Sequence, residues 1–166
     1  MLATDGSPCS EQAVEEVARR PWPAGTVVRV LSVIEFNTVA GPEALEMSQA
    51  YYDELERLAH GDLDRATSRL RQKASTKLAV ESLSRTGSPR QVILEEAESW
   101  GADLIVVGSH GRGLAGRFLL GSVSQAVATH ARCSVEIVRL GRDAVSRRDE
   151  GGARRCPAET AAGDAI

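Results

Sequence analysis

The chain has few cysteines and no long apolar run. Its three cysteines, Cys9, Cys133 and Cys156, lie far apart and form no CxxC pair, so we expect reduced thiols and no disulfide framework. No apolar stretch approaches the roughly 20 residues of a membrane-spanning helix. The chain reaches Asp5 within four residues, which does not fit a signal peptide. A soluble, cytoplasmic protein with no membrane partner is expected.

The sequence also lacks the positive charge that nucleic-acid binding requires. Its 166 residues carry a net charge of −3, whereas proteins that bind nucleic-acid phosphates present a dense basic surface. The hydrophobic and charged fractions, 42% and 26%, are typical of a globular protein. After Gly141 there is hardly an apolar side chain, so we predict one domain over residues 1–140 and a disordered tail over residues 141–166.

Short β-branched stretches alternate with stretches of helical periodicity. Ser7-Pro8 and Ser88-Pro89 each place a hydroxyl before a proline, which is typical of a helix start. A break is expected at Gly61, and the apolar stripe of the helix around it, with Tyr51 and Tyr52, is expected to be core. Strands are predicted over residues 1–4, 26–34, 78–85, 102–107 and 134–139. Helices are predicted over residues 8–20, 42–74, 89–100 and 122–130.

This alternation predicts an α/β fold: a doubly wound, five-stranded parallel sheet with helices on both faces. Parallel strands are joined through crossover helices, and ligands bind outside the carboxyl ends of the strands where the winding reverses. With the strand order 3-2-1-4-5, the reversal lies between the first and fourth strands. Asp5-Gly6-Ser7 and the segment that begins at Gly108 would therefore meet.

Residues 108–124, GSHGRGLAGRFLLGSVS, resemble two common phosphate loops only superficially. GRGLAG is a literal G-x-G-x-x-G, but it begins several residues after the strand and only one strand follows, which does not fit a dinucleotide fold. Gly116-x4-Gly121 is followed by Ser122 without the lysine that a P-loop requires. No lysine follows Lys77 in the chain.

A third arrangement uses other glycines of this segment. Gly108 at the strand end would let a base or ribose approach the backbone, and Gly111 would give the turn its conformational freedom. Gly121 and Ser122 open the last helix, where free amides and the positive end of the helix dipole attract anions. The hydroxyls of this helix start, with Arg112 and Arg117, would assist.

The spacing Gly108-x2-Gly111-x9-Gly121-Ser122 matches the motif G-x2-G-x9-G-[ST] at every position. With Asp5-Gly6-Ser7, LSVIE at residues 31–35 and ADLIVVGSHG at residues 102–111, the chain resembles the ATP-binding type of the universal stress protein family. The resemblance implies an adenine nucleotide alpha hydrolase-like fold and a regulatory module of the stress response. The expected ligand is ATP or AMP, with or without Mg²⁺.

The resemblance also implies roles for single residues. Asp5 would face the ribose and the backbone of Val33 the adenine, while Val107 and Gly108 would line the nucleoside. The phosphates would be held by Gly111, Gly121, Ser122, Val123 and Ser124. A homodimer would form through the last strand, Ser134–Arg139, because an apolar edge strand needs a partner.

Plainer interpretations of the same residues stay open. Asp5 is also a common turn former, Ser122 a common N-cap, and His110 suits a solvated loop. No catalytic residue or metal ligand is identified, because the loops offer no lysine, no paired carboxylates and no convincing base. Slow ATP hydrolysis, or a member that binds only proteins and no nucleotide, are the alternatives to a nucleotide-binding module.

Overall fold

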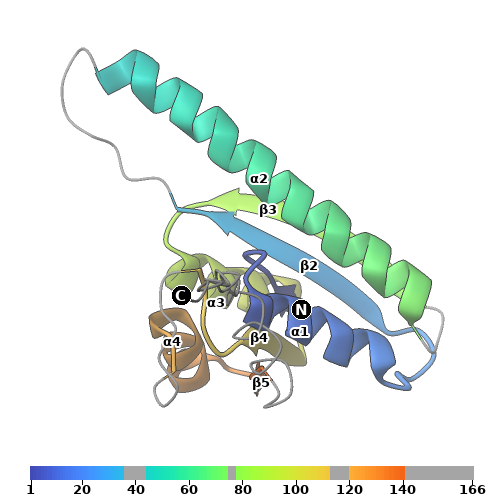
Figure 1. The fold of residues 1–166 in the computed structure, drawn as a ribbon. Helices are drawn as coiled ribbons and strands as arrows, with labels where there is room; N and C mark the ends of the chain where they lie inside the picture. Colours follow the sequence, from blue (N-terminus) through green and yellow to red (C-terminus); the bar gives the residue numbers. More distant parts are fainter. Residues whose placement is uncertain (36–43, 75–77, 113–119, 141–166) are drawn as a thin grey trace, which may run out of the picture.

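The fold is a parallel sheet with helices on both faces (Figure 1). The computed structural model describes residues 1–35, 44–74, 78–112 and 120–140. The expected tail over residues 141–166, Arg117 and Cys156 lie outside these ranges. The strands are β1 (Leu2–Ala3), β2 (Val27–Ile34), β3 (Ala79–Thr86), β4 (Leu104–Gly108) and β5 (Ser134–Val138). The helices are α1 (Pro8–Arg19), α2 (Ala44–Lys73), α3 (Pro89–Trp100) and α4 (Ser122–His130).

The strand order is β3-β2-β1-β4-β5 with every neighbouring pair parallel, as the sequence predicts. Leu2 of β1 lies between Val30 of β2 and Val106 of β4. The winding reverses between β1 and β4, so the two loops that follow these strands leave the sheet side by side.

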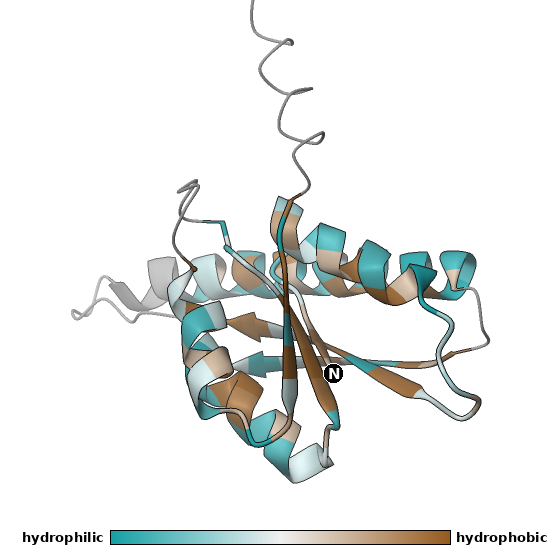
Figure 2. Ribbon diagram, turned by 90° about the horizontal axis from the view of Figure 1, so that it is seen from below, coloured by the Kyte–Doolittle hydropathy of each residue, from teal (hydrophilic) through white to brown (hydrophobic). Residues whose placement is uncertain are grey.

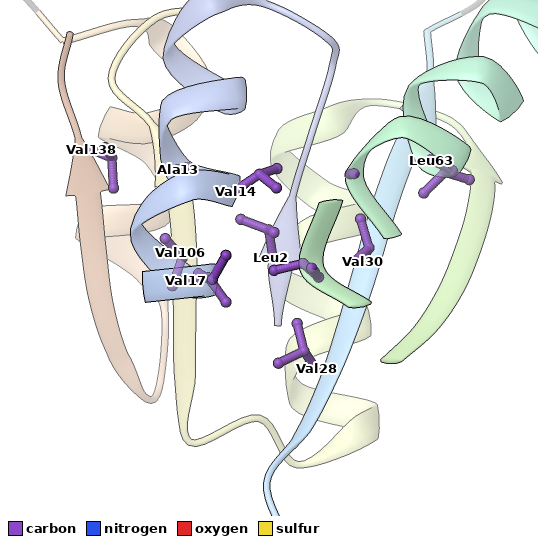
Figure 3. Close-up of a cluster of buried hydrophobic side chains, with 12 residues drawn as sticks. Leu2, Ala13, Val14, Val17, Val28, Val30, Leu63, Val106 and Val138 are labelled. Atoms are coloured by element: carbon purple, nitrogen blue, oxygen red, sulfur yellow. The ribbon is translucent and has the colours of Figure 1, made fainter. Parts of the chain in front are cut away.

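Two apolar clusters fill the space between the sheet and its helices. On one face α1 and α2 cover the sheet, and Val14, Leu63 and Leu70 pack on Leu2 and neighbouring valines (Figure 3). On the other face Ile93 of α3 and Val127 of α4 pack with Leu31, Ile105 and Val107. The strands at the centre are predominantly hydrophobic and the helices present hydrophilic residues outward (Figure 2). This pattern is typical of strands buried on both faces.

The two Ser-Pro pairs begin helices as predicted. Ser7 is the N-cap of α1, and its hydroxyl accepts a hydrogen bond from the Ser10 amide at 3.3 Å. Ser88 occupies the N-cap of α3 without such a bond. Gly101 ends α3 in the left-handed conformation, with a φ of 71°, which glycine adopts at little cost.

The long helix α2 differs from the prediction at two points. It runs without interruption through Gly61 over 30 residues, so the expected break is wrong: one glycine costs a helix only about 1 kcal/mol, and packing on β2 and β3 outweighs it. Figure 1 shows that α2 extends beyond the strands at its N-terminal end. Tyr51 of α2 is 56% exposed, so it does not belong to the core.

The central strand β1 has only two residues, and Met1 helps to hold it in place. The amino group of Met1 donates a hydrogen bond to the Leu104 carbonyl oxygen at 2.7 Å, and the Met1 carbonyl oxygen accepts one from the Val106 amide at 2.9 Å. Burial lowers the pKa of this amino group from 8.0 to about 6, because a low-dielectric surrounding disfavours the charged form. Among the described helices, none is long and apolar enough to cross a membrane.

Candidate functional site

A cavity of about 390 Å³ opens at the carboxyl ends of β1, β2 and β4. This volume lies within the range of small-molecule sites. Its walls come from the ends of these strands, from the first turns of α3 and α4, and from the segment that follows β4. The position is the one expected from the reversal of the winding between β1 and β4.

All nine residues predicted to form a site line this one cavity. They come from four separate stretches of the chain that the fold brings together, which no local pattern in the sequence could guarantee. They are Asp5, Val33, Val107, Gly108, Gly111, Gly121, Ser122, Val123 and Ser124.

The Asp5 carboxylate joins the two loops that meet at the cavity. Its Oδ1 atom accepts a hydrogen bond from the Ser7 amide at 3.0 Å, and its Oδ2 atom accepts one from the Arg112 amide at 3.2 Å. Ser7 adds a second link, because its hydroxyl donates to the His110 carbonyl oxygen at 3.2 Å. Asp5 thus stabilises a turn, as one interpretation proposed, and also forms part of the wall.

Two glycines of the motif allow close packing, a role that the sequence did not indicate. A Cβ atom on Gly111 would lie 2.7 Å from Oδ2 of Asp5, and Gly111 has no positive φ. A Cβ atom on Gly108 would lie 2.7 Å from the backbone of Cys9 and Ser10. Gly108 therefore lets α1 approach β4, and Gly111 makes room for a carboxylate.

The start of α4 presents fewer free groups than expected. Gly121, not Ser122, is the N-cap, and its amide donates to the Ser109 carbonyl oxygen at 2.8 Å. The Ser124 hydroxyl is buried and donates to carbonyl oxygens of Ser109 and Gly121, each at 2.9 Å. In any α-helix the first amides lack an acceptor within the helix. Within the described part of the chain, the amides of Ser122 and Val123, both cavity-lining residues, remain as donors.

Ser109 positions this helix start, and the sequence analysis did not identify it. It is fully buried, its amide donates to the Val138 carbonyl oxygen at 2.7 Å, and its hydroxyl lies 3.1 Å from Nδ1 of His110. Its carbonyl oxygen accepts the two bonds from Gly121 and Ser124. The family resemblance of residues 102–111 includes Ser109, but it does not show whether this residue contacts a ligand or only positions the start of α4.

The charge around the cavity also departs from expectation. Glu35 lines the cavity with Asp5, so the described part of the wall carries two carboxylates where the sequence indicated no pair. His110 is also part of the wall, as are Pro89 and Ile93 of α3, all missed as site residues. None of the described lining residues is lysine or arginine, and the described residues contain no cluster suited to a metal ion.

The family model of the universal stress proteins matches residues 1–139 of the chain. The chain belongs to the universal stress protein family. A putative universal stress protein of Staphylococcus epidermidis is 32% identical over 145 residues, which cover 84% of this chain and 82% of the relative. The cavity described above is therefore a feature of a universal stress protein.

Two solved structures have a fold similar to that of this universal stress protein. Hypothetical protein MJ0577, whose biochemical function was assigned from its structure, superposes with a TM-score of 0.75 at 25% identity, covering 85% of this chain and 94% of that one. A universal stress protein in complex with cAMP superposes with a TM-score of 0.57 at 25% identity, covering 83% of this chain and 93% of the other.

Proposed function

We propose that this universal stress protein binds an adenine nucleotide, ATP in the first place, in the cavity at the ends of β1 and β4, as a regulatory module of the stress response. One observation carries the proposal: the nine residues singled out by motif and resemblance all line a single cavity. The solved family member that holds cAMP supports an adenine nucleotide as the ligand class.

The arrangement suits the two ends of a nucleotide differently. Val33, Val107 and Leu31 offer an apolar surface for a base, and the Asp5 carboxylate is an acceptor for ribose hydroxyls. The α4 start, with the amides of Ser122 and Val123 and the exposed Ser122 hydroxyl, is the end for the phosphates. Amides and the helix dipole bind anions without help from a lysine.

Thermal unfolding with and without nucleotide tests the proposal. ATP at a hundred times its dissociation constant should raise the free energy of unfolding by about 2.7 kcal/mol. For a chain of this length, that corresponds to a rise of about 5–10 °C in the midpoint. AMP, cAMP and GTP in parallel samples, each with and without Mg²⁺, give the base and phosphate preference. The absence of any shift with adenine nucleotides at millimolar concentration would contradict the proposal.

Slow hydrolysis of ATP is the alternative, and it has less support. Phosphoryl transfer depends on positioned cations and a positioned nucleophile. Among the described lining residues there is no arginine or lysine, and both oxygens of the Asp5 carboxylate already accept backbone amides. Glu35 is the other carboxylate of the wall. We therefore favour nucleotide binding over ATP hydrolysis as the function of this cavity.

We also propose a homodimer through β5. The Ser134 amide donates to Asp103, and the Val138 carbonyl oxygen accepts from Ser109, so these backbone groups face β4. Neighbours along a strand alternate in direction, so the amides of Val135 and Ile137 point to the outer edge. In the described part of the chain no further strand follows β5 in the sheet, and such an edge pairs readily with another.

Light scattering tests this dimer. The wild-type protein should show twice the chain mass of 17.7 kDa. Ile137→Pro removes one outward amide and should give the monomer mass, while Ile137→Val keeps the amide and should leave the dimer intact. A wild-type mass of one chain, or a dimer unaffected by the proline, would contradict pairing through this edge.

A further inference from the structure

Asp62 of α2 is a buried carboxylate that reaches the loops of the cavity from outside its wall. Its side chain is 2% exposed and packs directly against Gly6, whose φ of 69° and missing Cβ allow this contact. Asp62 is not among the residues that line the cavity. It nevertheless contacts a residue that directly follows two cavity-lining residues.

That residue is Arg112. Its guanidinium forms an ion pair with Oδ2 of Asp62, and its backbone amide donates to Oδ2 of Asp5 at 3.2 Å. His110 and Gly111, the two residues before it, line the cavity, while Arg112 does not. The backbone of Arg112 is thus at the cavity's rim, and its charge is directed away from the cavity toward α2.

Asp62 has a second cationic partner. Arg65, one turn further along α2, forms an ion pair with Oδ1 of Asp62. A buried carboxylate that loses its only partner is strongly destabilised, but here Arg65 would still compensate the charge if Arg112 left. The Arg112 side chain is 51% exposed, so it has solvent-accessible space in which to change its direction.

We propose that Asp62 determines how strongly the cavity discriminates by phosphate charge, because it competes with the ligand's phosphates for Arg112. This inference rests on the proposed function. The described wall carries Asp5 and Glu35 and no lysine or arginine, so a polyphosphate gains from a nearby guanidinium. Arg112 can supply it only by giving up Asp62, and that exchange weakens binding of every ligand that needs Arg112.

Four variants and two ligands test the competition. Dissociation constants for ATP and for adenosine, which has no phosphate, are measured by titration calorimetry on the full chain, with circular dichroism as a check of folding. Asp62→Asn frees Arg112 and should tighten ATP binding about twofold to fivefold, the range expected from one ion pair. Adenosine binding should not change. Arg112→Gln should weaken ATP binding by a similar factor, and Asp62→Asn combined with Arg112→Gln should behave like Arg112→Gln alone.

Arg65→Gln is the matched control. Like Asp62→Asn it abolishes the pair between Asp62 and Arg65, but it leaves Arg112 as the one ion-pair partner of the carboxylate among the described residues. ATP binding should therefore weaken, opposite to the effect of Asp62→Asn. A purely structural role of Asp62 predicts weaker binding of ATP and adenosine alike in both variants.

The outcomes separate this inference from the function on which it rests. If the wild-type protein binds ATP and Asp62→Asn binds it equally or more weakly, competition for Arg112 is wrong and the proposed function stands. If Asp62→Asn fails to fold, the inference still requires weaker ATP binding in both Arg65→Gln and Arg112→Gln with adenosine binding unchanged, and any other pattern overturns it. If the wild-type protein binds no adenine nucleotide, both proposals fall.

Discussion

Ser122→Asp should abolish the stabilisation by ATP without loss of stability in the protein alone. Ser122 is the exposed first residue of α4 and lines the cavity. A carboxylate at a helix N-terminus is favourable by about 0.3–1 kcal/mol, so the midpoint without nucleotide should hold or rise slightly. A phosphate about 4 Å away would be repelled by about 4 kcal/mol at an effective dielectric constant of 20. The thermal shift with ATP should therefore disappear.

Three comparisons give this experiment its specificity. Ser122→Asn introduces a side chain that is similar in size to aspartate but neutral, and this variant should keep most of the thermal shift with ATP. Gln125→Glu adds the same charge to an exposed residue of α4 outside the cavity wall and should keep it too. Adenosine should stabilise Ser122→Asp as it does the wild-type protein, because only the phosphates meet the new charge. A full ATP shift in Ser122→Asp would exclude the α4 start as the phosphate site.

The second large effect is expected at Gly108, where a substitution should lower the free energy of unfolding. A methyl group there would lie 2.7 Å from the carbonyl carbon of Cys9 and from the amide nitrogen of Ser10. Both atoms belong to the backbone of the first turn of α1, so no side chain can rotate away and the helix must move off β4. Overpacking of this kind costs about 1–3 kcal/mol, occasionally more. Urea unfolding of Gly108→Ala should show a loss of this size.

Gly111→Ala is the matched comparison, because its methyl group would meet a movable side chain. The nearest atom is Oδ2 of Asp5, also at 2.7 Å, and that carboxylate can rotate. We expect little change in the free energy of unfolding and a weaker response to nucleotide, since Asp5 would lose its bond to the Arg112 amide. Equal losses of stability in the two alanine variants would contradict this division of roles between fold and cavity.

Most of the fold followed from local pattern. The β-branched strands, the Ser-Pro helix starts and the alternation of elements predicted the five-stranded parallel sheet and the bounds of α4, because each signal reflects interactions within a few residues or a general rule of parallel sheets. Gly61 and Tyr51 were predicted wrongly. Whether a glycine interrupts α2, and how far that helix extends past the sheet, depends on packing between elements that are distant in sequence.

The residues of the site likewise divide into those that the sequence predicts and those that only the packing of distant elements brings together. The glycine motif and the resemblance located nine residues of the wall, but Ser109, Glu35 and Asp62 were not recognised. Ser109 acts through its buried backbone, and Glu35 lines the cavity only because β2 ends beside β1. Asp62 lies 57 positions after Asp5 in a helix of otherwise ordinary polar residues, and only the packing of α2 over Gly6 brings it to the loops.

Because β1 is short, few backbone pairs connect the two halves of the sheet beside the cavity. Eight register pairs join β2 to β3 and five join β4 to β5, but β1 contributes two pairs toward one half of the sheet and a single pair toward the other. The two halves of the sheet are therefore joined through the few register pairs of one short strand. Val33 lies in β2 on one side of β1, and Val107 lies in β4 on the other side. A ligand that contacts both valines would therefore add a connection between the two halves of the sheet.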